Sequence, residues 1–246
     1  MNEKKYLIVN ADDFGQSGGV NRGIMKAHQQ GIVTSASLMV RWPDATGAAA
    51  YGKEHSDLSL GLHLDLGEWF YSNQNWVPLY EVVPLNEVTA VEKEVSYQVE
   101  MFHQLVGKKP THIDSHQHVH LREPVRSVAI ELARTLSVPL RRFSRVHYCG
   151  TFYGQTEEGT PFHDVISVDG LINILSGLRV GITELSCHPG DGTDLNTMYR
   201  IERAKEVEVL CDPQVRAGIF SMDIQLCSFN DIANPAEAHR LNAAEL

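Results

Sequence analysis

Side chains that can bind a divalent metal gather at three places in this sequence. Each place directly follows an apolar run rich in Val, Ile or Leu, and the three segments are Asn10–Gly15, Gly61–Asp65 and Thr111–His120. The carboxyl ends of successive parallel strands meet at one end of a sheet or barrel, so carboxylates and imidazoles placed there would converge. One carboxylate and two imidazoles leave coordination positions open, which is typical of a catalytic metal site. The sequence therefore predicts a catalytic metal centre at this end.

Two neighbouring aspartates, Asp12 and Asp13, offer two different functions at such a centre. One carboxylate can bind the metal while the other removes a proton from water. Taken singly, each signal has a simpler explanation, because Asp-Asp often forms a turn or helix cap and His63 alone fits a hydrogen-bonded core residue. The His-x-His-x-His pattern at 116–120 is stronger, since three alternating imidazoles have no obvious packing purpose. We expect only one or two of them to contact the metal, and the others to hydrogen-bond to the metal ligands or to donate to the substrate.

Strand alternation narrows the choice of residues that face the site. Successive side chains of a strand point to opposite faces, so His112, Asp114 and His116 are expected on one face, with His116 nearest the mouth. His188 follows a later apolar run, and the same alternation places Cys187 on the opposite face. This arrangement argues against a thiol nucleophile formed by Cys187 and His188.

The elements that must position these residues are short strands that alternate with helices, which indicates βαβ units and a parallel sheet. Apolar residues recur at steps of three or four over 88–106, and Gly107 is the expected helix stop. Pro124 is expected to begin a second helix, and 201–210 a third. Arg141 would lie on the fifth of seven strands, which are expected at 6–9, 34–40, 58–64, 111–114, 139–143, 182–186 and 224–229.

Two longer segments, 67–85 and 144–161, interrupt this alternation and are expected to be loops. Long loops in compact domains are usually functional. The first carries a dense set of aromatic residues, namely Trp69, Phe70, Tyr71, Trp76 and Tyr80. An aromatic set of this kind could stack on a sugar ring, but packing of these rings against the barrel rim explains them equally well.

The composition excludes several classes of partner. A chain of 246 residues that is 43% hydrophobic can bury one large core, so we expect a single domain over 1–246 with an exposed tail from about residue 233. The net charge of -10 and the pI near 5.6 argue against nucleic acid or an anionic membrane as the main partner. We expect no signal segment or membrane span, and four dispersed cysteines without a Cys-x-x-Cys pair indicate a reducing cytoplasm.

Together, these segments resemble the YdjC-like carbohydrate deacetylase family, which includes the chitooligosaccharide deacetylases. The resemblance covers nearly the whole chain and runs through 8–15, 31–35, 61–63, 109–120 and 184–190. It implies an α/β fold, a single-domain, distorted and incomplete (β/α) TIM-like barrel. The implied enzyme removes an acetyl group from an N-acetylated sugar with one divalent metal ion, Mg²⁺ or Zn²⁺, at the barrel mouth.

The resemblance also implies a role for each of five residues. Asp13, His63 and His116 would bind the metal, which polarises the amide carbonyl and lowers the pKa of water. Asp12 would be the general base. His188 would be the acid that protonates the departing amine, because an amine cannot leave as an anion.

Substrate binding is less specified by the sequence. Similar proteins place a basic residue near the site at the position of Arg141, although Arg142 is its neighbour, and Trp69 is a candidate for contact with the sugar. The expected partner is a small saccharide, chitobiose-like and with or without phosphate, and a homo-oligomer is compatible with the sequence. Two alternatives stay open: another barrel metal hydrolase, amidohydrolase-like or a phosphoesterase, that uses His116 and His118 as a pair, and a sugar-binding protein without turnover.

Overall fold

Seven parallel strands form the main sheet in the part of the chain that the structure describes. The computed structural model describes residues 4–156, 158–195 and 197–233, so the tail expected from about residue 233 lies almost entirely outside the described residues. The strands run in the order β6-β3-β2-β1-β8-β7, and β9 pairs with β1. Their bounds are β1 Lys5–Phe14, β2 Ser35–Leu38, β3 Ser59–Leu64, β6 Ile113–Ser115, β7 His147–Cys149, β8 Gly181–Cys187 and β9 Ile224–Leu226.

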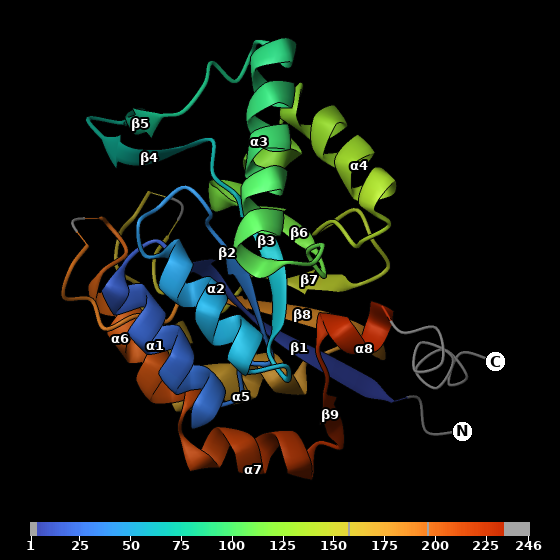
Figure 1. Ribbon diagram of the computed structural model, residues 1–246. Coiled ribbons are helices and arrows are strands. Elements are labelled where there is room, and N and C mark those ends of the chain that lie inside the picture. Colours follow the sequence, from blue (N-terminus) through green and yellow to red (C-terminus); the bar gives the residue numbers. More distant parts are fainter. Residues whose placement is uncertain (1–3, 157, 196, 234–246) are drawn as a thin grey trace.

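The central strand β1 changes partners along its length, and this change curls the sheet. One side of β1 pairs with β8 from Lys5 to Ala11. The other side pairs first with β9, at residues 5–7, and then with β2 from Asn10 onward. The result is a curled, incomplete barrel (Figure 1), which confirms the fold expected from the sequence.

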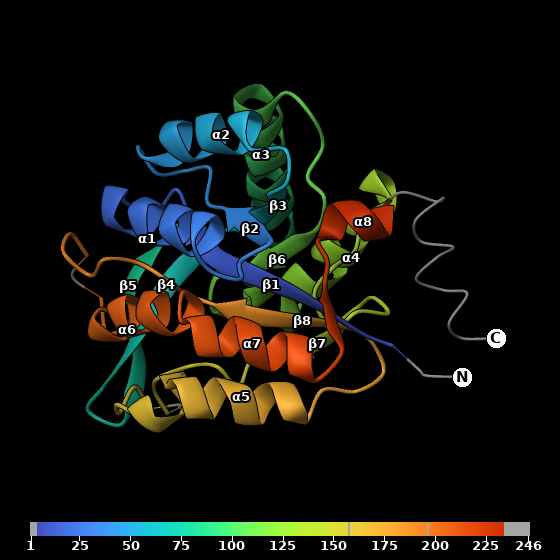
Figure 2. The same ribbon diagram turned by 90° about the horizontal axis from the view of Figure 1, so that it is seen from below.

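Helices cover the outside of this barrel (Figure 2). The described α-helices are α1 Gly18–Gln29, α2 Ala45–Glu54, α3 Val88–Val106, α4 Val125–Leu136, α5 Val168–Ser176, α6 Ile201–Leu210, α7 Pro213–Ser221 and α8 Phe229–Ala233, and two 3₁₀ turns are η1 His116–Leu121 and η2 His163–Ile166. Apolar residues of the sheet and of these helices form one large buried cluster, as in a single domain. None of the described helices has both the length and the apolar character needed to cross a membrane.

The helix predicted at 88–106 is confirmed as α3, with the bounds that we expected. Val91, Val95, Phe102 and Val106 lie on its buried face. Gly107 follows with a φ of 80°, a left-handed conformation that glycine adopts without steric cost, and its N–H bonds back to the helix. The expected helix at 201–210 is confirmed as α6, and Pro124 is the N-cap of α4.

The prediction of a strand at 139–143 is wrong. Only Leu140 forms a bridge, to Ile113 of β6, and the next strand along the chain is β7. The chain turns directly after Arg141, because Arg142 has a φ of 65° and the N–H of Phe143 bonds to the carbonyl of Leu140. The segment is therefore held against the barrel by the bridge at Leu140, and the side chain of Arg141 is buried in the interior.

The segment 67–85 is not a loop as expected but carries an antiparallel hairpin, β4 Gly67–Ser72 and β5 Asn75–Glu81. Its turn residues Asn73 and Gln74 both have positive φ, at 49° and 63°. Such a two-residue turn matches the right-handed twist of the strands that it joins. Figure 1 shows this hairpin projecting beyond the barrel, and the segment that follows it leads into α3.

Candidate active site

The five residues to which we assigned chemical roles lie at one end of the barrel. They follow or end parallel strands: Asp12 and Asp13 in β1, His63 in β3, His116 after β6, and His188 after β8. A cavity of about 540 Å³ lies here, and all five residues line it. Parallel strands thus deliver side chains from four separate segments to one place.

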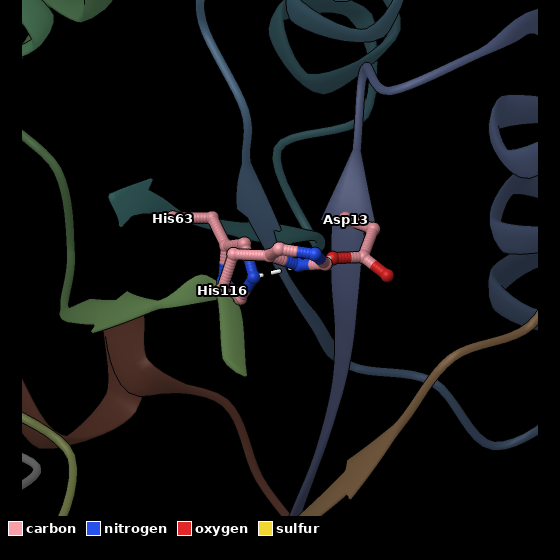
Figure 3. Close-up of side chains that lie close together, drawn as sticks. All are labelled: Asp13, His63 and His116. Carbon is pink, nitrogen blue, oxygen red and sulfur yellow. Dashed lines mark hydrogen bonds and ion pairs between the residues drawn. The ribbon is translucent and has the colours of Figure 1, made fainter. Parts of the chain in front are cut away.

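Asp13, His63 and His116 converge on one point (Figure 3). Oδ1 of Asp13 lies 3.2 Å from Nε2 of His63 and 2.9 Å from Nδ1 of His116. All three residues are buried, and one donor atom from each lies within 4.8 Å of the others. The sequence placed these residues at a common end, and the structure brings their donor atoms together.

The backbone at the end of β1 explains why adjacent aspartates face different partners. Asp13 has a φ of 67°, an uncommon conformation for any residue other than glycine, so the strand alternation breaks at this residue. Gly15 has a φ of 93°, and a Cβ there would lie 2.9 Å from the Cα of Ala45. The chain therefore bends tightly here, and Asp12 and Asp13 diverge.

Each of the two imidazoles faces a second carboxylate with its other nitrogen. Nδ1 of His63 donates to Oδ1 of Asp114 at 2.7 Å, and Nε2 of His116 lies 3.8 Å from Oε2 of Glu68. Burial disfavours a charged imidazole, yet Asp114 raises the pKa of His63 to about 9. Burial is likewise outweighed at His116, where Asp13 raises the pKa well above its usual value. This end of the barrel therefore attracts positive charge.

The donor set of Asp13, His63 and His116 fits a divalent ion. One carboxylate and two imidazoles are ligands that zinc and other transition metals accept, and they leave positions open. A second group of converging donors, formed by Asp12, His63 and Asp114, fits less well. The guanidinium of Arg141 lies within 2.7 Å of both of its carboxylates, so a cation already occupies that side.

Asp12 is held by a network of buried polar groups. Arg141 binds both of its oxygens, and the amide of Asn10 and the hydroxyl of Ser186 donate to it as well. Burial opposes ionisation of this carboxyl, but the charge of Arg141 holds its pKa below the usual range. Asp12 is therefore an anion with a fixed orientation. Arg141 also contacts Glu184, whose pKa burial raises to about 7.

His188 faces Asp12 from the end of β8. Its Nε2 lies 3.7 Å from Oδ2 of Asp12, and its ring packs edge-on against Tyr153 and Tyr199. Its backbone N–H donates to Glu206 of α6. Burial lowers the pKa of His188 to about 4, so its ring is neutral at physiological pH. Cys187 points elsewhere, with its thiol donating to the carbonyl of Asn10.

The remaining histidines of the 116–120 pattern turn away from the metal donors. Gln117 and His118 have φ of 47° and 55°, so the chain kinks directly after His116. His118 is hydrogen-bonded through Nε2 to the hydroxyl of Tyr148, and His120 through Nδ1 to Ser115. In the described residues, neither belongs to a group of converging metal donors.

The aromatic hairpin contributes both support and cavity wall. Tyr80 donates to Asp65 and packs edge-on against Trp42, so it anchors the hairpin to the barrel. Trp69 and Trp76 line the cavity, and Trp76 is 52% exposed. Packing against the barrel therefore explains Tyr80, while contact of Trp69 with a sugar stays a prediction.

Two residues of the site escaped the sequence reasoning. Arg203 of α6 donates from Nη2 to Oδ2 of Asp13 at 2.7 Å, and Glu68 of β4 faces His116. Arg203 and Glu206 lie one turn apart on α6 and are buried, whereas Ile201 is 59% exposed. The apolar periodicity of a helix predicts that its charged residues face solvent. The sequence alone therefore gives no sign that Arg203 and Glu206 face the interior.

The comparisons with known proteins agree with this geometry. The model of the YdjC-like protein family matches residues 6–219. A carbohydrate deacetylase of Geobacillus stearothermophilus is 34% identical over 250 residues, which cover 92% of this chain and 98% of that protein. A chitooligosaccharide deacetylase of Serratia marcescens is 30% identical over 93% of this chain and 100% of that protein.

Solved structures share the fold. A protein of Enterococcus faecalis V583, whose name refers to cellobiose-phosphate cleavage, superimposes with a TM-score of 0.73 at 25% identity, over 93% of this chain and 99% of that chain. A family 4 carbohydrate esterase from Streptomyces lividans, solved in complex with acetate, gives a TM-score of 0.54 at 13% identity over 91% of each chain. The curled barrel is thus common to proteins of low sequence identity.

Proposed function

The chain belongs to the YdjC-like protein family, and on this basis we propose that it is a metal-dependent carbohydrate deacetylase. The substrate is an N-acetylated sugar or short oligosaccharide, chitobiose-like and with or without phosphate. The observation that carries the proposal is the convergence of Asp13, His63 and His116 beside an aspartate and a histidine in one cavity. Cytoplasmic location and Mg²⁺ or Zn²⁺ as the metal stay predictions from the sequence.

We assign the metal to Asp13, His63 and His116. When bound, a divalent ion would polarise the amide carbonyl and make water more acidic. Arg203 holds the second oxygen of Asp13, which leaves Oδ1 directed at the two imidazoles. The negative surroundings that raise the pKa values of both imidazoles in the protein alone also favour a cation at this point.

Asp12 acts as the general base and His188 as the acid. Asp12 takes a proton from water as the oxygen attacks the acetyl carbon, and Arg141 keeps its carboxylate ionised and oriented. His188 starts neutral, so it must gain a proton before it can give one to the departing nitrogen. Oδ2 of Asp12 at 3.7 Å is placed to supply it. The C–N bond breaks, and acetate and the free amine are the products.

The alternatives lose support in this geometry. A second hydrolase type would pair His116 with His118, but His118 bonds to Tyr148 and lies outside the converging donors of the described chain. A sugar-binding protein without turnover would need no oriented base and acid next to the metal donors. Asp12 and His188, 3.7 Å apart beside these donors, therefore support turnover.

Acetate release tests the proposal. Protein loaded with Mg²⁺ or Zn²⁺ should release acetate from short N-acetylglucosamine oligomers or their phosphates. Asp12→Asn should abolish release while one equivalent of metal stays bound, because Asn cannot accept the proton. Asp57→Asn is the matched control, since the Asp57 side chain is 78% exposed and forms its ion pair with His28, away from the candidate site. Full activity of Asp12→Asn would refute the base assignment.

A further inference from the structure

His116 differs from His63 in how its outer nitrogen is satisfied. Both rings direct one nitrogen at Oδ1 of Asp13. The outer nitrogen of His63 bonds to Asp114 at 2.7 Å, whereas Nε2 of His116 is buried and has no hydrogen-bond partner among the described residues. The carboxylate of Glu68, at 3.8 Å, faces this atom.

Glu68 is held in this position by its neighbours. The side-chain amide of Gln117 bonds to both backbone groups of Trp69, accepting from its N–H at 2.9 Å and donating to its carbonyl at 2.8 Å. Gln117 directly follows His116, and Trp69 directly follows Glu68. The two bonds therefore fix β4 of the hairpin against the turn that carries His116, and the Glu68 residue is 8% exposed.

The tautomer of His116 depends on this contact. A neutral imidazole carries one N–H, and a ring that offers Nδ1 to a metal must carry its proton on Nε2. A buried N–H requires an acceptor, and metal-bound histidines regularly find it in a carboxylate that fixes the orientation of the ring. His63 has such a carboxylate in Asp114, at 2.7 Å, and the carboxylate that faces Nε2 of His116 is that of Glu68, at 3.8 Å.

We propose that Glu68 is a positioning residue whose carboxylate accepts a hydrogen bond from the Nε2–H of His116 and thereby holds Nδ1 of this ring toward the metal. The inference rests on the metal site of the proposed function. It adds a carboxylate from the hairpin, which also carries the cavity residues Trp69 and Trp76. The wall that receives the substrate and the orientation of a metal ligand are thus joined in one element.

Metal affinity tests this role without reference to activity. Glu68→Ala should weaken Zn²⁺ binding, measured by competition with a chelating dye, by about 10- to 100-fold. Glu68→Gln should recover most of the affinity, because the amide oxygen still accepts a hydrogen bond from the Nε2–H of His116. Glu81→Ala is the matched control, since Glu81 is exposed on β5 of the same hairpin, and it should stay within twofold of wild type.

A second measurement is independent of how the variants fold. Nitrogen-15 NMR of the Zn²⁺-loaded wild-type protein should show His116 with its proton on Nε2 and zinc on Nδ1. Zinc on Nε2, or wild-type affinity in a folded Glu68→Ala variant, would overturn the role of Glu68 and leave the proposed function intact. A wild-type protein that binds no divalent metal would overturn both.

Discussion

Arg141 binds both carboxylate oxygens of Asp12, with Nη1 2.6 Å from Oδ2 and Nη2 2.7 Å from Oδ1. The same guanidinium contacts Asp114 at 2.7 Å and Glu184 at 2.6 Å. The buried guanidinium of Arg141 therefore binds three carboxylates. Because it is planar and contacts both oxygens of Asp12, it holds the Asp12 carboxylate in one orientation. The proposed base is fixed by a residue of a different segment, which forms one β-bridge with the sheet in the described part of the chain.

Arg141→Lys should lower kcat by about 100-fold, because an ammonium group cannot bind both oxygens and a misplaced base loses about this factor. The variant keeps the positive charge, so the three carboxylates are not left without a cation. Zn²⁺ affinity should change by less than threefold, since Arg141 does not contact Asp13, His63 or His116. Steady-state acetate release and dye competition measure the two quantities.

Arg142→Lys is the control for this change. Arg142 is exposed and stacks over the ring of Tyr148 at 4.4 Å, without contact to Asp12. It should retain kcat within threefold. Equal losses in the two variants would mean that this turn affects activity through its general structure and not through the orientation of Asp12.

The sequence predicted which residues meet at this end of the barrel better than it predicted the elements that carry them. Residues such as Asp13 and His63 could be found because strand ends meet at one face, whatever the precise length of each strand. Arg141 was placed near the site although its strand does not exist, since one bridge at Leu140 is enough to fix the segment. Tertiary bonds such as Gln117 to Trp69 join distant segments, and no local pattern encodes them.

His188→Gln should lower amide hydrolysis by about 100- to 10,000-fold, the usual contribution of a positioned acid. An aryl acetate needs no proton on its leaving group, so its hydrolysis should fall by less than tenfold. Rates for both substrates, measured on the same preparation, separate loss of the acid from loss of the site. His103→Gln, on the exposed face of α3, should leave both rates unchanged. Equal losses for amide and ester in His188→Gln would contradict the acid role.

His112 should make the protein sensitive to acid. Its ring is buried and stacks on Phe229 at 3.8 Å, and burial lowers its pKa to about 4. The unfolded chain, with a pKa of about 6.5, binds the proton more readily, so stability is full above pH 6.5 and falls as pH drops toward 4. This group alone should lower the free energy of unfolding by about 3 kcal/mol over that range.

Urea unfolding of wild type and His112→Phe at pH 7 and pH 4 isolates this contribution. Other histidines whose pKa is lowered, such as His118 and His120, act in the same direction but are present in both proteins. The stability of wild type relative to His112→Phe should therefore fall by about 3 kcal/mol on acidification. An unchanged difference would show that His112 does not titrate between the two pH values.

Gly61 should tolerate no side chain, because a Cβ at this position of β3 would lie 2.4 Å from Cε1 of His112. Gly61→Ala should lower the free energy of unfolding by about 1 to 3 kcal/mol, the usual cost of overpacking a core. Gly47→Ala is the control. Among the described residues, no atom beyond its chain neighbours and its own helix backbone lies within 4 Å of a Cβ there, and its place in helix α2 predicts a gain of about 0.5 to 1 kcal/mol.

The clash with His112 also predicts how two changes combine. If the ring is what the new methyl group meets, shortening it should make room, so the double variant Gly61→Ala/His112→Ala should cost less than the sum of the single changes. Contacting residues show coupling of about 0.5 to 3 kcal/mol, and independent sites add. Urea unfolding of the four proteins gives this coupling. If the effects of the two single changes simply add, the strain of Gly61→Ala does not come from the ring of His112. That result would contradict the contact that the structure shows.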